Sequence, residues 1–71
     1  MKIKFREGVG PSRKTVLEII DGSNYLVPRP GETIHIESPY EDEQEIYKVY
    51  HIERFYKKDT TLEVIVHLEV N

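Results

Sequence analysis

The chain has 71 residues, which is enough for one small domain with a modest hydrophobic core. It contains no cysteine, and this excludes disulfides, thiolate metal sites and cysteine nucleophiles. No apolar run approaches the roughly 20 residues of a membrane-spanning helix, and the first residues lack the apolar core of a signal peptide. These features predict a single-domain protein of the cytoplasm.

The net charge of −3 is divided unevenly along the chain. Residues 1–14 hold five basic side chains and one acidic side chain, for a charge of +4. Residues 15–71 hold five basic and twelve acidic side chains, for a charge of −7. Such a division is typical either of a surface that binds a charged partner or of ordinary surface charge on a small domain.

The chain opens with a predicted strand. Residues 2–7 alternate polar and apolar side chains, so we expect Ile3 and Phe5 to point inward. Residues 8–12 contain two glycines and a proline and are a turn by composition.

The next segment, residues 14–20, is compatible with either a strand or a short helix. Its β-branched side chains favour a strand, and so does the Asp21-Gly22 hairpin signal that follows. That hairpin would lead into a further short strand at residues 25–27.

The middle of the chain is predicted to break, form a strand and break again. Two prolines and a glycine interrupt any strand in residues 27–32. Residues 33–37 then alternate, with Ile34 and Ile36 expected inward. Residues 40–45 follow as a polar loop.

The last third predicts a long β-hairpin. Residues 46–56 are rich in β-branched and aromatic side chains, and the turn at Lys57–Thr60 is short enough to force antiparallel pairing with residues 62–70. The apolar parity of the first strand slips near Tyr50-His51, which indicates a bend or bulge there. The second strand has an apolar row of Leu62, Val64, Val66, Leu68 and Val70, and we expect its other row, with Glu63, Ile65, His67 and Glu69, to face solvent.

Five or six short strands in so short a chain predict an all-β fold, a small SH3-like barrel with a long C-terminal hairpin. The pattern that runs from Pro28-x-Pro30-Gly31-Glu32 through Tyr47-x-Val49 to Val64-x-Val66-x-Leu68 resembles the small SH3-like barrel proteins of bacteriophages and prophages. The resemblance covers residues 27–70. It implies a barrel fold, a phage-type origin and a non-enzymatic function.

An acidic loop is the strongest local charge feature. Glu41, Asp42, Glu43 and Glu45 follow Tyr40, and together these residues are our leading candidates for contact with a host or viral protein. The loop lacks the ligand spacing and the glycine of a calcium loop, so we expect no metal there.

The basic N-terminal segment supports an alternative function, the binding of nucleic acid or a nucleotide phosphate. Its candidate contacts are Lys2, Lys4, Arg6, Arg13 and Lys14. The segment lacks the glycine directly before lysine that a phosphate-binding loop requires. Five aromatic residues could stack bases beside it, although we favour a core role for Phe5, Tyr47, Tyr50, Phe55 and Tyr56.

The remaining residues do not predict chemistry. His35, His51 and His67 are evenly spaced in predicted strands, and we expect exposed sheet histidines rather than a zinc site. No serine or histidine is spaced to form a nucleophile with its base, so we expect neither an enzyme nor a cofactor. A third functional hypothesis is a structural subunit that forms dimers or rings by pairing its edge strands.

Overall fold

A computed structural model describes residues 1–8, 13–22, 27–37 and 44–70. It confirms the predicted all-β class and the assignment of a strand, rather than a helix, after residue 13. Among the described residues there is no helix that could span a membrane. The five strands are β1 (Lys2–Glu7), β2 (Lys14–Ile19), β3 (Thr33–Glu37), β4 (Gln44–Tyr56) and β5 (Leu62–Val70).

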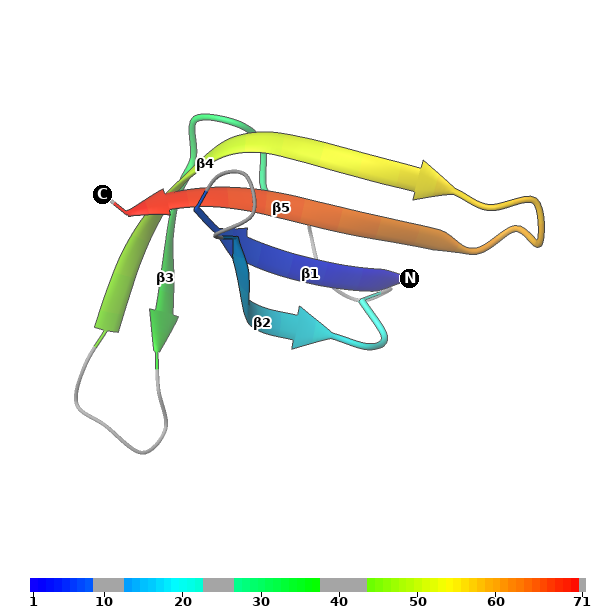
Figure 1. Ribbon diagram of the computed structural model, residues 1–71, viewed down its shortest axis with the longest axis horizontal. Coiled ribbons are helices and arrows are strands. Elements are labelled where there is room, and N and C mark those ends of the chain that lie inside the picture. The colour runs from blue at the N-terminus through cyan, green and yellow to red at the C-terminus, as the bar shows by residue number, and fades with distance from the viewer. Residues whose placement is uncertain (9–12, 23–26, 38–43, 71) are drawn as a thin grey trace.

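The strands form one sheet in the order β2-β1-β5-β4-β3, which curls into a half-barrel (Figure 1). Three neighbouring pairs are antiparallel, including the long β4–β5 hairpin. The β1–β5 pair is parallel and joins the two ends of the chain, with Phe5 beside Val66. Because the curl stops short of closure, β2 and β3 are the two edges of the sheet.

The hydrophobic core lies on the inner face of the half-barrel, where β1, β4 and β5 meet. Ile3 and Phe5 point inward as predicted, and the inner row of β5 is confirmed at its centre. The end of that row differs, because Val70 lies at the rim of the sheet and is exposed. The core consists of Ile3, Phe5, Tyr47, Val49, Val64, Val66 and Leu68.

The predicted irregularity in β4 is a β-bulge. Val49 lies opposite Leu68 and His51 lies opposite His67, so Tyr50 is an extra residue without a partner on β5. A bulge bends its strand and increases the local twist. It lets β4 pair with β5 along the long hairpin and with β3 at its other end (Figure 1).

Two side chains of the predicted solvent-facing row of β5 are buried instead. Ile65 is 9% exposed and His67 only 2%. The expectation of an exposed His67 is therefore wrong. The physical reason has two parts. β5 is the central strand, with β1 on one side of it and β4 on the other. The bulge in β4 also brings the rings of Tyr50 and His51 close to the His67 ring.

The predicted hairpin at Asp21-Gly22 is not formed by the residues that the structure describes. The Gly22 N–H donates to the Met1 carbonyl at 2.6 Å, which ties this segment to the start of β1. Val27 lies in no strand, and the rest of the predicted strand, Tyr25 and Leu26, lies outside the described residues.

The turn between β4 and β5 is the predicted one. The Lys57 N–H donates to the Thr61 carbonyl, and the Thr60 N–H donates to the Lys57 carbonyl, both at 3.0 Å. The Asp59 carboxylate accepts hydrogen bonds from the Thr61 hydroxyl at 2.6 Å and the Thr61 N–H at 3.0 Å. These two bonds hold the pKa of Asp59 below its usual range.

Replacing Thr60 by glycine is expected to raise the free energy of unfolding by about 0.5–1 kcal/mol. Thr60 has a φ of 72°, a left-handed conformation that a β-branched side chain resists. Chemical denaturation of the two proteins measures the gain. Thr61→Gly is the matched control next door, and it should destabilise because it removes the hydroxyl that donates to Asp59.

Candidate binding groove

The inner face of the half-barrel continues into an open groove between the edge strands β2 and β3. Its volume of about 550 Å³ lies within the range of roughly 300–1000 Å³ that is typical of ligand sites. Most of its lining is apolar, and the polar residues lie on the side of β3 and the segment before it. The lining residues are Phe5, Leu17, Ile19, Val27, Pro28, Arg29, Glu32, Ile34, His35 and Ile36.

A tight turn before β3 forms one rim of the groove. The Glu32 N–H donates to the Arg29 carbonyl at 3.1 Å, and the Glu32 carboxylate accepts from the Arg29 N–H at 2.7 Å. Gly31 has a φ of 95°, which a side chain would resist. The turn is fastened to β4, because the Gly31 N–H donates to the Val49 carbonyl and the Val49 N–H donates to the Glu32 carbonyl.

The two edges of the groove differ in how readily they could accept another strand. β2 has a bulge, because Leu17 pairs with Phe5 and Thr15 with Arg6, which leaves Val16 unpaired. Bulges and charged side chains are devices that protect an edge from pairing, and β2 also carries a lysine and a glutamate. β3 pairs with β4 through five consecutive residues without a shift. β3 is therefore the more regular of the two edge strands.

The molecule exposes more surface than a closed domain of its size. Its accessible surface is 5400 Å², whereas a monomeric protein of 8.4 kDa exposes about 4600 Å². Its radius of gyration is 12.6 Å, compared with about 11 Å for a compact domain of this length. The excess over that average, roughly 800 Å², is comparable with the area that one partner buries in an ordinary protein–protein interface.

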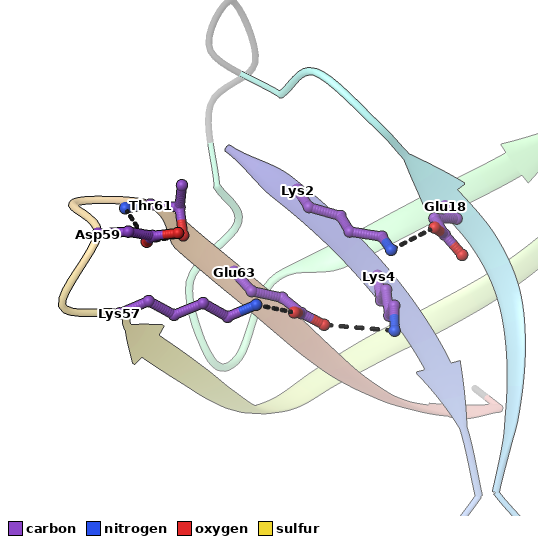
Figure 2. A network of polar contacts seen from close by, with 7 residues as sticks. All are labelled: Lys2, Lys4, Glu18, Lys57, Asp59, Thr61 and Glu63. Atoms are coloured by element: carbon purple, nitrogen blue, oxygen red, sulfur yellow. Dashed lines mark hydrogen bonds and ion pairs between the residues drawn. The ribbon is translucent and has the colours of Figure 1, made fainter.

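The outer face of the sheet carries a network of ion pairs (Figure 2). Lys2 contacts Glu18 across β1 and β2 at 3.0 Å. Glu63 on β5 lies between Lys4 at 3.3 Å and Lys57 at 3.4 Å. The hydrogen bond from Lys4 is the largest cause of the lowered pKa of Glu63. These pairs connect β2, β1 and β5 with the turn residue Lys57, and surface pairs of this kind contribute little stability each.

These ion pairs involve most of the basic residues predicted for phosphate binding. Lys2 and Lys4 are paired as described, and Lys14 lies 3.9 Å from Glu7. The Arg13 guanidinium contacts the His67 ring. Arg6 is half-buried on β1. Lys2, Lys4 and Lys14 thus face acidic neighbours rather than a shared open surface.

The acidic loop that we predict to bind a partner is described at one residue only. Tyr40, Glu41, Asp42 and Glu43 lie outside the described residues, in the connection between β3 and β4. Glu45 lies on β4 and accepts a hydrogen bond from the hydroxyl of Tyr47. Burial is the main cause of the raised pKa of Tyr47, and the carboxylates of Glu45 and Glu7 raise it further. Glu45 therefore satisfies a core tyrosine.

The buried His67 is the centre of a polar cluster on the outer face. The Arg13 guanidinium has only donors, so it donates to Nδ1 of His67, 3.3 Å away. The Nε2–H of His67 then donates to the Glu53 carboxylate. The His51 ring lies 5.5 Å from that of His67.

The polar groups near His67 make neither a metal site nor an orphaned charge. Every buried side-chain nitrogen and oxygen in the described part of the chain has a hydrogen-bond partner. His35 lies away on β3, so the three histidines do not meet. No group of three or more histidine or acidic side chains is placed to hold a metal among the residues described.

The five aromatic residues considered for stacking divide between the core and the surface. Phe5 and Tyr47 are core residues, as we favoured. The prediction is wrong for Tyr50, Phe55 and Tyr56, which are exposed. Tyr50 is the bulge residue of β4, and Phe55 and Tyr56 lie at the end of β4 next to the hairpin tip. Tyr50 donates to the Gly8 carbonyl at 3.1 Å.

Lowering the pH is expected to destabilise the β4–β5 hairpin. The pKa values of Asp59 and Glu63 are lowered in the folded state. Their contribution to stability is therefore complete above the unfolded carboxyl pKa of about 4 and is lost as the pH falls through the folded values. Thermal unfolding at decreasing pH should show a falling midpoint. Asp59→Asn should flatten this dependence, and an unchanged slope would contradict the role given to Asp59.

Comparison with family models, curated proteins and solved structures finds no match to this chain. The groove must therefore be interpreted from its own residues. Sequence patterns did not identify it, because the inward prediction for Ile34 and Ile36 does not say how little covers them. One signal in the sequence could have predicted it. The chain has several inward apolar residues on β2 and β3 but few further residues that could cover them.

Proposed function

We propose that the protein is a non-enzymatic interaction module that binds a partner protein on the open side of its half-barrel. The observation that carries the proposal is an apolar groove that lies between the two edge strands of the sheet, in the part of the chain that the structure describes. An extended segment of a partner can add to such an edge through its backbone and place alternate side chains in the groove. The excess exposed surface is comparable with the area that an interface of ordinary size would remove.

The acidic connection between β3 and β4 belongs to the same proposal. By sequence it carries Glu41, Asp42 and Glu43 next to Tyr40, and it directly follows the regular edge strand β3. Basic residues in the partner would be attracted to these charges and would add selectivity. The resemblance to phage barrel proteins supports a host or viral protein as the partner, in the cytoplasm.

Site-specific photo-crosslinking in the cells that make the protein tests the groove directly. A photoreactive amino acid replaces Leu17, which lines the groove and is 39% exposed, or Tyr56, which lies at the hairpin tip and is 78% exposed. We expect a discrete adduct from position 17 and none from the control position. Ile36→Lys should remove the adduct because it places a charge in the apolar floor. Equal adducts from both positions, or an adduct that survives Ile36→Lys, would contradict the proposal.

Charge reversal tests the contribution of the acidic connection. Glu41, Asp42 and Glu43 are changed to lysine together, and Glu45 is left in place because it accepts the Tyr47 hydrogen bond. The adduct from position 17 should weaken. Binding of DNA or RNA that weakens steeply with added salt would instead favour the phosphate-binding alternative. The ion pairs of Lys2, Lys4 and Lys14 favour the groove over that alternative.

A further inference from the structure

We infer that the tip of the β4–β5 hairpin binds single-stranded nucleic acid, with Tyr56 stacking on a base and the cations beside it contacting phosphates. The inference does not depend on the proposed function, because the tip shares no residue with the described lining of the groove. It adds a second binding site and a ligand of a different chemical class.

The tip of the hairpin stands out from the body of the sheet (Figure 1). β1 pairs with β5 from Glu63 onward, whereas β4 and β5 continue to the pair of Tyr56 with Leu62 and to the turn beyond it. Phe55 is 43% exposed and Tyr56 is 78% exposed. Arg54 is exposed as well. Two aromatic rings and a cation therefore contact solvent on a projecting hairpin.

Arg54 and Tyr56 lie on the same face of this hairpin. They are two residues apart on β4, and side chains two apart in a strand point to the same side. The three cross-strand pairs on this face, which begin at Ile52, contain no acidic side chain. An exposed ring beside a cation is the arrangement on which a base stacks while the neighbouring phosphate is neutralised.

The tip is basic although the chain is acidic. Residues 54–60 hold three basic side chains and one acidic side chain, for a charge of +2. The acidic one, Asp59, is held within the turn by two hydrogen bonds, and Glu63 nearby lies between two lysines (Figure 2). In the described part of the chain, the side chains of Arg54 and Lys58 have no hydrogen-bond or ion-pair partner. These two cations are therefore available to neutralise phosphates.

The arrangement of charge and rings favours a single strand over the two other polyanionic surfaces. Anchors at a membrane surface bury apolar side chains in the lipid boundary. The apex of this hairpin, Lys57–Thr60, carries two lysines and an aspartate, and it would meet the lipid before either ring. In a duplex the bases are stacked on one another, whereas the bases of a single strand offer a free face to Tyr56.

Fluorescence anisotropy of a labelled oligothymidylate, titrated with the purified full chain, tests the inference. We expect binding at low salt that weakens about 7–20-fold for a fourfold rise in salt concentration, as two or three phosphate contacts predict. Tyr56→Ala should weaken binding about fivefold or more, whereas Tyr56→Phe keeps the stacking face and should retain it. Arg54→Gln combined with Lys58→Gln should flatten the salt dependence. All three side chains are exposed, so urea unfolding of the variants should match the wild type.

The control variant is Lys14→Gln, because the Lys14 side chain is 73% exposed and belongs to the basic N-terminal segment. Salt dependence by itself would fit that segment equally well, so the variants locate the site. With an aliphatic photoreactive residue, the crosslinking control at position 56 lacks the ring and should give no adduct. The inference would be overturned by undetectable binding at low salt, or by equally tight binding of the oligothymidylate annealed to oligoadenylate. Equal losses in Tyr56→Ala and Tyr56→Phe, or a loss in Lys14→Gln with the tip variants unaffected, would also overturn it.

Discussion

Replacing Glu53 by leucine is expected to lower the free energy of unfolding by about 2 kcal/mol. The Glu53 carboxylate accepts the Nε2–H of His67, whose side chain is 3% exposed. Nδ1 of that ring already accepts from Arg13, so no other tautomer restores the lost bond. Without Glu53 a buried N–H has no acceptor, and leaving such a group unsatisfied costs more than the bond contributes.

The reciprocal change should cost less. His67→Leu leaves Glu53, whose side chain is 39% exposed and can bond to water. The double variant replaces both partners by apolar groups, and it should be more stable than Glu53→Leu alone. Thermal or urea unfolding of the four proteins gives the coupling energy, which we expect at about 1–2 kcal/mol. A domain of this length should lose about 8–16 °C of melting temperature in the Glu53 variant. Equal losses in the two single variants would contradict this asymmetry.

The strands themselves were predictable because their signals are local. The alternation around Val64, Val66 and Leu68 depends on side chains two residues apart, and the parity slip at Tyr50 reports the bulge directly. The turn at residues 57–60 is equally local.

Burial of His67 was not predictable from the same pattern, because it depends on which strands lie beside β5. The parallel pairing of β1 with β5 brings Arg6 next to His67, about sixty residues away along the chain. The alternation of side chains along β5 predicts only that His67 lies on the same face as Glu63 and Ile65. The neighbouring strands and the segment that supplies Arg13 decide whether that face is exposed to solvent.

The groove was not predicted from the sequence, for a related reason. Ile34 and Ile36 point inward whether the barrel closes or stops short of closure. Closure depends on whether β2 and β3 meet, which is a property of strand order and curl rather than of either strand. The acidic residues 41–43 were conspicuous in the sequence, yet the contacts that place Glu45 against Tyr47 came only from the fold.

Replacing Gly22 by alanine is expected to cost about 1–3 kcal/mol of unfolding free energy. A Cβ at this position would lie 2.6 Å from Cδ1 and 2.8 Å from Cγ1 of Ile3, and 3.2 Å from the Met1 carbonyl oxygen. Ile3 is a core residue that is only 1% exposed, so its side chain has little room to shift away from the new Cβ. The backbone is no easier to shift, because the Gly22 N–H donates to that same Met1 carbonyl.

A second substitution separates this steric cost from a general weakening of the segment. Ile3→Val removes the atom nearest to the new Cβ and alone should cost about 0.5–1.5 kcal/mol. The double variant with Gly22→Ala should then lose at least about 1 kcal/mol less than the sum of the single changes. Gly31→Ala is the matched control, since its Cβ meets no atom within 4 Å and its cost arises from a φ of 95°. Denaturant unfolding should show that Ile3→Val rescues the first glycine variant and not the second, because only the first is a collision with the core.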